Sequence, residues 1–241
     1  MSLTQDLVSK VLAAHGEVRE VGEGYLLSLS KPGKQKTAES TRPLALLSTC
    51  RKVLTSTVLR RVEGAVSEYL PSRQHAPRKK RSTPEATWTA QALRATVGRY
   101  IEQYQYLATD MSKAFDSVTR VKLLEVTEGS RLADEDSLRV TQYLVSGATL
   151  KARVAREVGE TLGAVSGTPQ GGALSPTLLA AYLEWVMGMR RESHPSRGAV
   201  EDFTLQHADD TKVLFHSRDT QQAWGPHAET CVCEVRGRKS K

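Results

Sequence analysis

Two adjacent carboxylates, Asp209 and Asp210, stand between two short apolar runs of the chain. Apolar runs separated by a few polar residues predict a β-hairpin, with the two acids at its tip. A third acid, Asp110, ends a strand-like run that begins at Tyr106. Three converging carboxylates would repel one another strongly unless cations held them. The set therefore predicts a pair of divalent metals, as enzymes of phosphoryl and nucleotidyl transfer use. Ordinary turn carboxylates are the alternative.

Composition limits the class of protein. The 241 residues suffice for one large or two small domains. The net charge is +7 and the sequence pI is about 9.4. The positive charge is concentrated in a basic cluster at residues 73–81 and in a basic tail at residues 236–241. Such clusters attract phosphate backbones, although a charge run taken alone is more often a solvated surface.

Other classes are disfavoured. No stretch of about 18 apolar residues occurs, so no membrane span is expected, and the N-terminus lacks the apolar run of a secretory signal. The three cysteines, Cys50, Cys231 and Cys233, are too few for a disulfide framework and indicate a reducing compartment. His227 with the last two cysteines could be drawn as a metal-ligand set, but the spacing fits no usual zinc pattern.

Apolar spacing and capping residues predict the elements that carry these residues. Ser82, Pro84 and Glu85 mark the start of a helix whose apolar face, including Trp88, is expected in the core. A helix from Ser175 is expected to bury a stripe that includes Leu178, Ala181, Tyr182, Trp185, Val186 and Met189. Further helices are expected at 2–21, 44–62, 120–127 and 134–144, and strands at 25–29, 106–110, 149–155, 161–165 and on both sides of the acid pair.

Six short segments occur in an order typical of one enzyme family. They are Lys31-Pro32-Gly33 with residues 41–48, Arg78 with Arg81-Ser82-Thr83, residues 110–116, the loop Gly-Thr-Pro-Gln-Gly at 167–171, Leu174-Ser175-Pro176, and His207-Ala208-Asp209-Asp210. In this order they resemble the reverse transcriptase domain of non-LTR, or LINE-like, retrotransposons, with group II intron enzymes as more distant relatives. The resemblance covers about residues 23–216.

The resemblance implies an α+β fold. Its core would be a polymerase palm, an antiparallel sheet backed by helices, with a mixed finger subdomain and no recognisable thumb. The implied division is an N-terminal helix or extension at 1–22, fingers at 23–105, a palm at 106–217 and an irregular basic tail at 218–241. A chain of fingers and palm only would correspond to a truncated or decayed copy of the element.

Metal binding is the first role that the resemblance implies. Asp110, Asp209 and Asp210 would be the catalytic residues and would hold two Mg²⁺, with Mn²⁺ as a substitute. The backbone carbonyl of Met111 would be an additional ligand. One ion would lower the pKa of a primer 3′-hydroxyl and the other would grip the triphosphate. Mg²⁺ prefers carboxylate, water and phosphate oxygens, so few protein ligands are needed.

Nucleotide selection is the second implied role. Phe115, five residues after the first acid, would lie beneath the sugar of the incoming nucleotide. An aromatic ring there would collide with a 2′-hydroxyl and select deoxynucleotides; a core aromatic is the alternative. Gln170 and Gly171 would position the nucleotide or template, because glycine lets the backbone approach closely. A plain turn is the alternative for that loop.

Triphosphate binding from the fingers is the third implied role, assigned to Arg78, Lys79 and Arg81. A solvated basic loop is the alternative, because this chain departs from the family here. The usual Phe-Gly-Phe is replaced by His75-Ala76-Pro77, and a usual glycine by Lys80.

Together these roles imply RNA-templated DNA synthesis, in which dNTPs are added to a DNA primer on an RNA template. By analogy with the family, the protein would act inside the cell, in nucleus and cytoplasm, and no membrane partner is expected. His207 replaces the family's usual aromatic residue before the acids. The competing hypothesis is a relic that binds nucleic acid and keeps the fold but lacks turnover.

Overall fold

The structure is a computed structural model. It describes residues 3–13, 18–30, 33, 41–100, 105–111, 114–146, 149–154, 157–163, 167–168, 171–193, 204–208, 210–215 and 231–235. The chain divides into two compact units, and each is assembled from two segments. The first unit comprises Met1–Tyr69 and Phe115–Leu178, and the second comprises Leu70–Ala114 and Leu179–Lys241.

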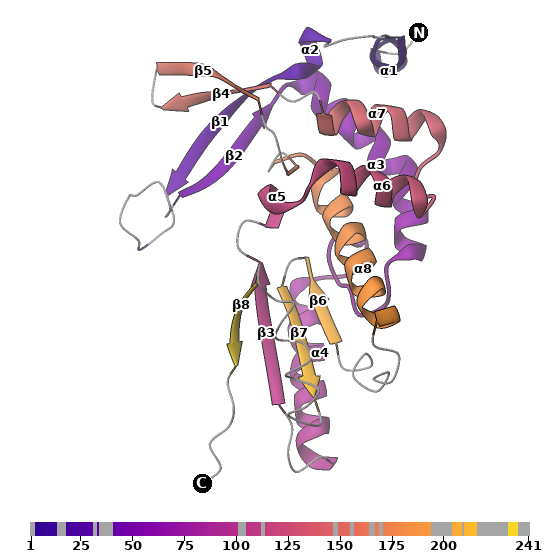
Figure 1. Cartoon of the computed structure of the whole chain (residues 1–241), viewed down its shortest axis with the longest axis vertical. Helices are drawn as coiled ribbons and strands as arrows, with labels where there is room; N and C mark the ends of the chain where they lie inside the picture. The colour runs from indigo at the N-terminus through magenta and orange to yellow at the C-terminus, as the bar shows by residue number, and fades with distance from the viewer. Residues whose placement is uncertain are drawn as a thin grey trace. The chain divides into compact units, whose positions relative to one another are not determined.

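The first unit contains a four-stranded sheet in the order β2-β1-β4-β5 (Figure 1). Its strands are β1 (Glu23–Ser30), β2 (Thr41–Leu47), β4 (Thr149–Val154) and β5 (Glu157–Gly163). β1 pairs antiparallel with β2 but parallel with β4, so the sheet is mixed. Ala45, Leu47 and Leu150 form the buried cluster of this sheet, with Leu26 packed against it.

Helices complete the first unit. They are α1 (Leu3–Ala13), α2 (Arg19–Gly22), α3 (Thr49–Tyr69), α5 (Ala114–Ser117), α6 (Arg120–Gly129) and α7 (Glu135–Ser146). The guanidinium of Arg51 in α3 is buried. It donates hydrogen bonds to the carbonyl of Val21 in α2, at 3.2 Å, and to the carbonyl of Leu144 in the last turn of α7. A cation at a helix C-terminus is favoured by the unpaired carbonyls there, so Arg51 ties three helices together.

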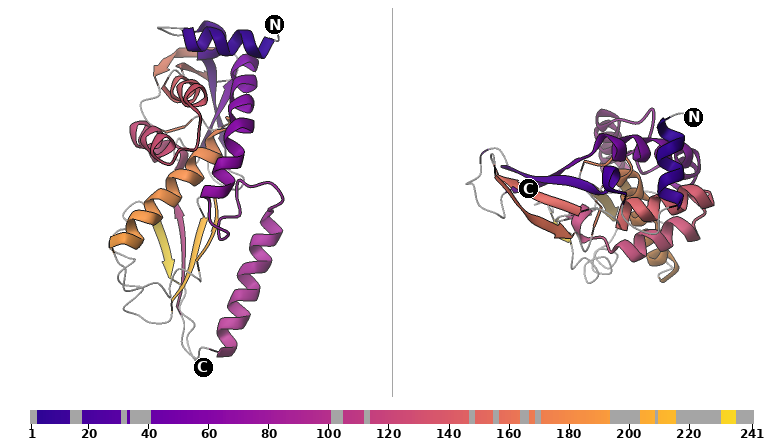
Figure 2. Two further views of the ribbon diagram at one scale, coloured as in Figure 1. Left: turned by 90° about the vertical axis from the view of Figure 1, so that its right-hand side faces the viewer. Right: turned by 90° about the horizontal axis from the view of Figure 1, so that it is seen from above.

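The second unit contains a four-stranded sheet in the order β6-β7-β3-β8. Its strands are β3 (Gln105–Met111), β6 (Thr204–His207), β7 (Asp210–Phe215) and β8 (Cys231–Val235), and every pairing is antiparallel. Leu205 and Val213 are buried in this sheet. Helix α4 (Thr83–Tyr100) lies along one side of the sheet and contacts β6 (Figures 1 and 2). Helix α8 (Ser175–Ser193) begins in the first unit and continues into the second.

Side-chain caps fix where two helices begin. Asp134 precedes α7, and its carboxylate accepts from the Ser137 backbone N–H at 2.9 Å and from the Ser137 hydroxyl at 2.8 Å. These hydrogen bonds lower the pKa of Asp134 below its ordinary value. Ser82 precedes α4 and accepts from the Glu85 backbone N–H at 3.3 Å. Both contacts satisfy helix N–H groups that have no partner within the helix.

Much of the predicted architecture is confirmed. The fold is α+β, with one antiparallel and one mixed sheet. The strands predicted at 25–29 and 106–110 correspond to β1 and β3, and the helices predicted at 120–127 and 134–144 correspond to α6 and α7. β6 and β7 pair antiparallel as the predicted hairpin, and Asp210 is the first residue of β7. Among the described residues, no helix is long and apolar enough to cross a membrane.

Other predictions are wrong in detail. The helix predicted at 44–62 begins only at Thr49, because the first apolar residues of that stretch pair with β1 as strand β2. Trp88 was expected in the core but is 70% exposed. In α8 the predicted residues Leu178 and Ala181 are buried, but the buried face also includes Leu179, Ala180 and Leu183, and Met189 is exposed. The single helix predicted at 2–21 is replaced by α1 and α2, and β8 lies in the stretch predicted to be irregular.

The cap of α7 leads to a stability prediction. We expect Asp134→Ala to lower the free energy of unfolding by about 1 kcal/mol at neutral pH. Because the pKa of Asp134 is lowered in the folded state, its contribution is present above the unfolded pKa of about 3.9. It is lost as the pH falls through the folded pKa, so the difference between wild type and variant is expected to shrink with acidification.

Urea unfolding at a series of pH values measures this difference. Asp136→Ala is the matched control, because Asp136 is an exposed acid in the first turn of the same helix. If Asp136→Ala loses as much stability as Asp134→Ala, the negative charge at the start of α7, rather than the cap hydrogen bonds, is responsible for the loss.

Candidate functional site

Asp110 and Asp210 belong to neighbouring strands of the antiparallel sheet. β3 and β7 pair in a register that sets Thr109 opposite Thr211. Asp110 follows Thr109 in β3 and Asp210 precedes Thr211 in β7, so both acids lie at the same end of the paired strands. The Asp210 side chain is exposed. Asp209 and the side chain of Asp110 lie outside the described residues.

The donor chemistry at this end of the sheet fits a divalent cation. Carboxylate oxygens are the protein ligands that Mg²⁺ prefers, and acids gathered at one strand end repel one another unless a cation lies between them. Met111, whose carbonyl is the additional predicted ligand, is the last residue of β3. Within the part of the chain that the structure describes, no group of three or more His, Cys, Asp or Glu side chains is arranged to hold a metal. The fit therefore rests on backbone position and residue chemistry.

The turn that precedes the acids has an unusual backbone and an unexpected partner. Ala208 adopts a φ of 56°, in the left-handed region. Its N–H donates to Oε1 of Gln74 at 3.2 Å, and Gln74 is almost completely buried. Sequence analysis missed Gln74, because a single glutamine within a basic run follows no pattern that distinguishes it from a surface residue.

Arg73 begins the basic cluster, but it does not behave as a surface cation. Its Nη2 atom lies 2.8 Å and 2.9 Å from the two carboxylate oxygens of Glu184 in α8. Both side chains are largely buried. A charged pair of this kind is costly to break, because removing one partner leaves the other charge buried and uncompensated.

Two further arginines of the cluster contact protein groups. Arg78 donates to the carbonyl of Pro71 at 2.9 Å, and Arg81 forms an ion pair with Glu85 in the first turn of α4. Lys79 is exposed. A triphosphate bound by Arg78 or Arg81 would therefore compete with these contacts.

His207 and His75 occupy the two positions where this chain lacks the expected aromatic residues. The Nε2 atom of His207 lies 3.1 Å from the hydroxyl of Thr83, which links β6 to the start of α4. His75 is buried, and its Nδ1 atom lies 4.0 Å from a carboxylate oxygen of Glu85. Burial and the nearby charge of Arg81 lower the pKa of His75. The imidazole is therefore neutral at pH 7.

The glycine-rich loop of the first unit is pinned to the segment that carries Phe115. The backbone N–H of Gly167 donates to the Val118 carbonyl at 2.8 Å, and that of Thr168 donates to the Phe115 carbonyl at 2.9 Å. Arg120 Nε donates to the Gly167 carbonyl at 3.0 Å. The structure thus brings Phe115 and the start of this loop together, and the Phe115 side chain is half-buried.

Gly171 is held tightly against the mixed sheet. Its φ is 117°, and a Cβ atom at this position would lie only 2.7 Å from the backbone carbonyl oxygen of Ala45 in β2. Both the backbone conformation and the close approach therefore require glycine. Gln170, the adjacent predicted nucleotide-binding residue, lies outside the described residues.

A family model described as reverse transcriptase (RNA-dependent DNA polymerase) matches residues 30–238. The chain belongs to the reverse transcriptase family. A search of curated protein sequences finds no match.

Solved telomerase structures share the fold of this reverse transcriptase chain. Apo telomerase from Candida tropicalis truncated from its C-terminal domain superposes with a TM-score of 0.65 at 13% identity, over 99% of this chain and 55% of that one. Telomerase from Candida albicans in complex with a TWJ fragment of telomeric RNA gives a TM-score of 0.64 at 12% identity, over 99% of this chain and 46% of that one. The chain thus spans about half the length of these telomerases.

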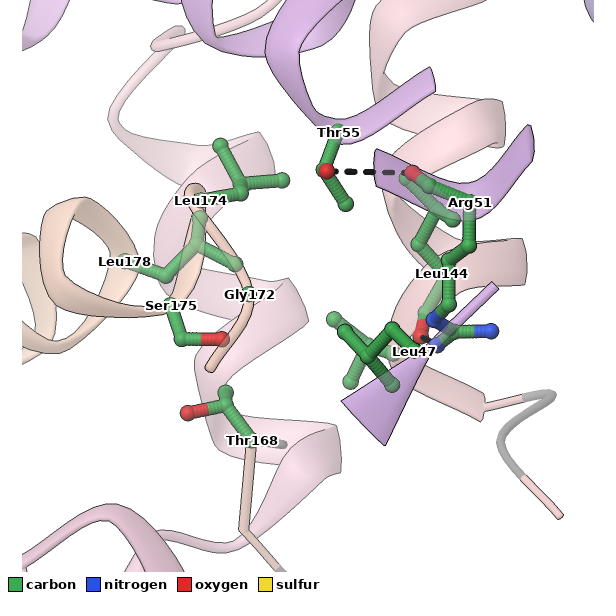
Figure 3. Close-up of a pocket in the computed structure, with 10 residues that line it drawn as sticks. Leu47, Arg51, Thr55, Leu144, Thr168, Gly172, Leu174, Ser175 and Leu178 are labelled. Atoms are coloured by element: carbon green, nitrogen blue, oxygen red, sulfur yellow. Dashed lines mark hydrogen bonds between the residues drawn. The ribbon is translucent and has the colours of Figure 1, made fainter. Parts of the chain in front are cut away.

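The first unit of this reverse transcriptase chain contains a cavity that cannot hold a nucleotide. Its volume is about 20 Å³, enough for one water molecule. Thr168 and Ser175 lie on one side of the cavity and Leu47 and Leu144 on the other (Figure 3). The buried hydroxyl of Thr168 has no hydrogen-bond partner among the described residues. A bound water molecule that hydrogen-bonds to the Thr168 hydroxyl fits this cavity.

Gly171 gives a second prediction. We expect Gly171→Ala to destabilise the reverse transcriptase chain by at least about 2 kcal/mol, because the new Cβ meets backbone and the conformation is strained. Gly64→Ala in α3 is the matched control, since no atom lies within 4 Å of its added Cβ. That substitution is expected to stabilise the helix by up to about 1 kcal/mol. Thermal or urea unfolding decides the matter, and a Gly171→Ala variant as stable as wild type would refute the proposed constraint.

Proposed function

We propose that this chain is an RNA-directed DNA polymerase of the non-LTR, LINE-like type, which adds dNTPs to a primer 3′-hydroxyl. One observation carries the proposal: Asp110 and Asp210 lie at one end of the paired strands β3 and β7 in a chain of the reverse transcriptase family. Bringing acids together at a strand end is costly without cations. Nucleotidyl transfer is a reaction that uses such a pair of cations.

In this proposal Asp110, Asp209 and Asp210, with the Met111 carbonyl, hold Mg²⁺ or Mn²⁺. Bound there, the ions would neutralise the triphosphate and lower the pKa of the primer 3′-hydroxyl. The protein's own contribution is then mostly positioning, because a reacting hydroxyl held close to the α-phosphate needs little further activation. The β3–β7 register supports this role, since backbone hydrogen bonds fix the strand ends.

Phe115 selects deoxynucleotides in this proposal. Only four residues separate Asp110 from Phe115 along the chain, so the proposed sugar-selecting and metal-binding residues are close in sequence. The hydrogen bond from Thr168 to the Phe115 carbonyl supports a common role for Phe115 and the loop that carries Gln170 and Gly171. The half-buried ring of Phe115 leaves part of its surface available to a ligand.

RNA template and DNA primer are the proposed macromolecular partners, inside the cell, in nucleus and cytoplasm. One face of the mixed sheet has the chemistry to bind them. Tyr25 and Leu46 lie opposite each other in β1 and β2 and are each 39% exposed. The guanidinium carbon of Arg153 lies 5.7 Å from the centre of the Tyr25 ring, and Lys151 is paired with Tyr25 in the register of β4. Aromatic rings beside cations suit single-stranded nucleic acid, because bases stack on the rings and phosphates bind the cations.

The acids provide the decisive experiment. We expect wild-type chain to extend a DNA primer on an RNA template with Mg²⁺ or Mn²⁺, and Asp209→Asn or Asp110→Asn to reduce extension by about a hundredfold or more. Changes in residues that merely support metal ligands already cost about 10–100-fold. Asp136→Asn, at an exposed position of α7, is the charge-matched control and is expected to extend normally.

A binding titration at two salt concentrations, run beside the extension assay, separates polymerase from relic. Salt-sensitive binding is expected from a basic protein that contacts phosphates. Binding without any extension by wild type would favour the nucleic-acid-binding relic over the polymerase. Extension that is unaffected by the Asp variants would contradict the catalytic role proposed for the acids.

Phe115 provides a separate test of sugar selection. We expect Phe115→Val to admit ribonucleotides, because the smaller side chain removes the collision with the 2′-hydroxyl, while deoxynucleotide use is largely retained. The ratio of kcat/KM for dNTP to that for rNTP should fall by at least about tenfold, a change of roughly 1.4 kcal/mol in discrimination. Unchanged discrimination would return Phe115 to an ordinary packing role.

A further inference from the structure

The segment that carries Gln74 forms an extension of the antiparallel sheet. β6 stands at the edge of that sheet, and Gln74 forms an isolated parallel bridge with Gln206. The His75 N–H donates to the Gln206 carbonyl at 2.9 Å, and the Gln206 N–H donates to the Arg73 carbonyl at 2.9 Å. Residues 73–75 therefore satisfy the outer edge of β6, which would otherwise present unpaired backbone groups.

The Gln74 side chain contacts the turn that carries the acids. Its Oε1 atom accepts from the Ala208 N–H at 3.2 Å and from the Ala76 N–H at 3.3 Å. Its amide nitrogen lies 3.5 Å from the Ala208 carbonyl oxygen. Gln74 thus holds both backbone polar groups of Ala208, the residue immediately before Asp209. A buried amide with this many partners has one well-defined orientation.

Ala208 needs such support because of its conformation. A left-handed φ of 56° costs an alanine about 1–2 kcal/mol relative to the right-handed regions. Residues in sparsely populated backbone regions persist when their surroundings determine the conformation. The Gln74 amide holds both the N–H and the carbonyl of Ala208 in this conformation.

The supporting segment is itself anchored. Arg73, next to Gln74, forms the largely buried ion pair with Glu184 through one Nη atom at 2.8 Å and 2.9 Å. Breaking such a pair is strongly unfavourable, so Arg73 gives Gln74 a fixed backbone from which to act.

We propose that Gln74 is a positioning residue: it fixes Ala208 in the left-handed turn and thereby orients Asp209 and Asp210 for binding divalent cations. The metal-binding part of this inference rests on the proposed function. The orientation of the turn by Gln74 does not depend on it.

If Gln74 were only a packing residue, replacing it and replacing Gln206 would have equal effects. Gln206 therefore provides the control that separates a packing role from a positioning role. Gln74 and Gln206 are both buried glutamines, exposed by only 1% and 2%, and they face each other in the bridge. Oε1 of Gln206, however, has no hydrogen-bond partner among the described residues. Replacing Gln206 by Met changes a similar buried volume without removing a bond to Ala208.

The test compares Gln74→Met with Gln206→Met in the full chain. Amide hydrogen exchange at Ala208 is measured by NMR, global stability by urea unfolding, and Mn²⁺ affinity by the electron paramagnetic resonance signal of free Mn²⁺. In Gln74→Met we expect Ala208 exchange at least about tenfold faster than any global destabilisation explains. We also expect the Mn²⁺ Kd to rise by about 10–100-fold. Gln206→Met is expected to leave both quantities near wild type.

Gln74→Glu covers the case in which Gln74→Met fails to fold. It keeps an acceptor oxygen for the Ala208 N–H, so Ala208 exchange should stay near the wild-type rate, and a rate as fast as that of unprotected amides would overturn the inference. Unchanged Ala208 exchange in Gln74→Met, unchanged Mn²⁺ affinity despite faster exchange, or equal effects in the two Met variants would each overturn it as well. A wild-type chain that binds no Mn²⁺ would overturn the proposed function and the metal-positioning role, whereas the exchange comparison still decides whether Gln74 fixes the turn.

Discussion

The antiparallel hydrogen bonding between β3 and β7 is the constraint on which the candidate site depends. The register that sets Thr109 opposite Thr211 leaves no freedom in where the strands end. A shift by one residue would move every side chain to the opposite face of the sheet and would move the acids relative to one another. The buried residues Leu205 and Val213 oppose such a shift, because it would expose apolar surface. Ordinary strand pairing and core packing therefore hold Asp110 and Asp210 at one end of the sheet.

Around this sheet, buried polar groups give the acid-bearing turn its shape. Gln74 binds both backbone polar groups of Ala208, and Arg73 is fixed by Glu184. Polar groups in a low-dielectric interior must be paired. The paired amide of Gln74 and the ion pair of Arg73 with Glu184 therefore permit few alternative arrangements of this segment. This explains why an alanine can hold a left-handed backbone without the conformational freedom of glycine.

In the first unit, close backbone contacts hold the glycine-rich loop in place. Gly171 packs directly against the Ala45 carbonyl, while Gly167 and Thr168 bond to the segment that begins at Phe115. Arg120 adds a side-chain hydrogen bond to Gly167. The loop is thereby defined at both of its described ends.

The sequence by itself determined the family, the α+β class and the acid-bearing hairpin, because these depend on local patterns: apolar periodicity, special turn residues and motifs in a fixed order. Only the tertiary structure decided which protein groups the arginines of the basic cluster contact. Arg73, Arg78 and Arg81 have the same local character as surface cations, yet each contacts a protein partner supplied by the fold. The exposure of Trp88 and the strand at 41–47 were also decided by tertiary neighbours, because an apolar stretch of sequence does not reveal which residues pack against it. Gln74 is the clearest case, because its importance comes from Ala208, a residue distant in the sequence that strand pairing brings beside it.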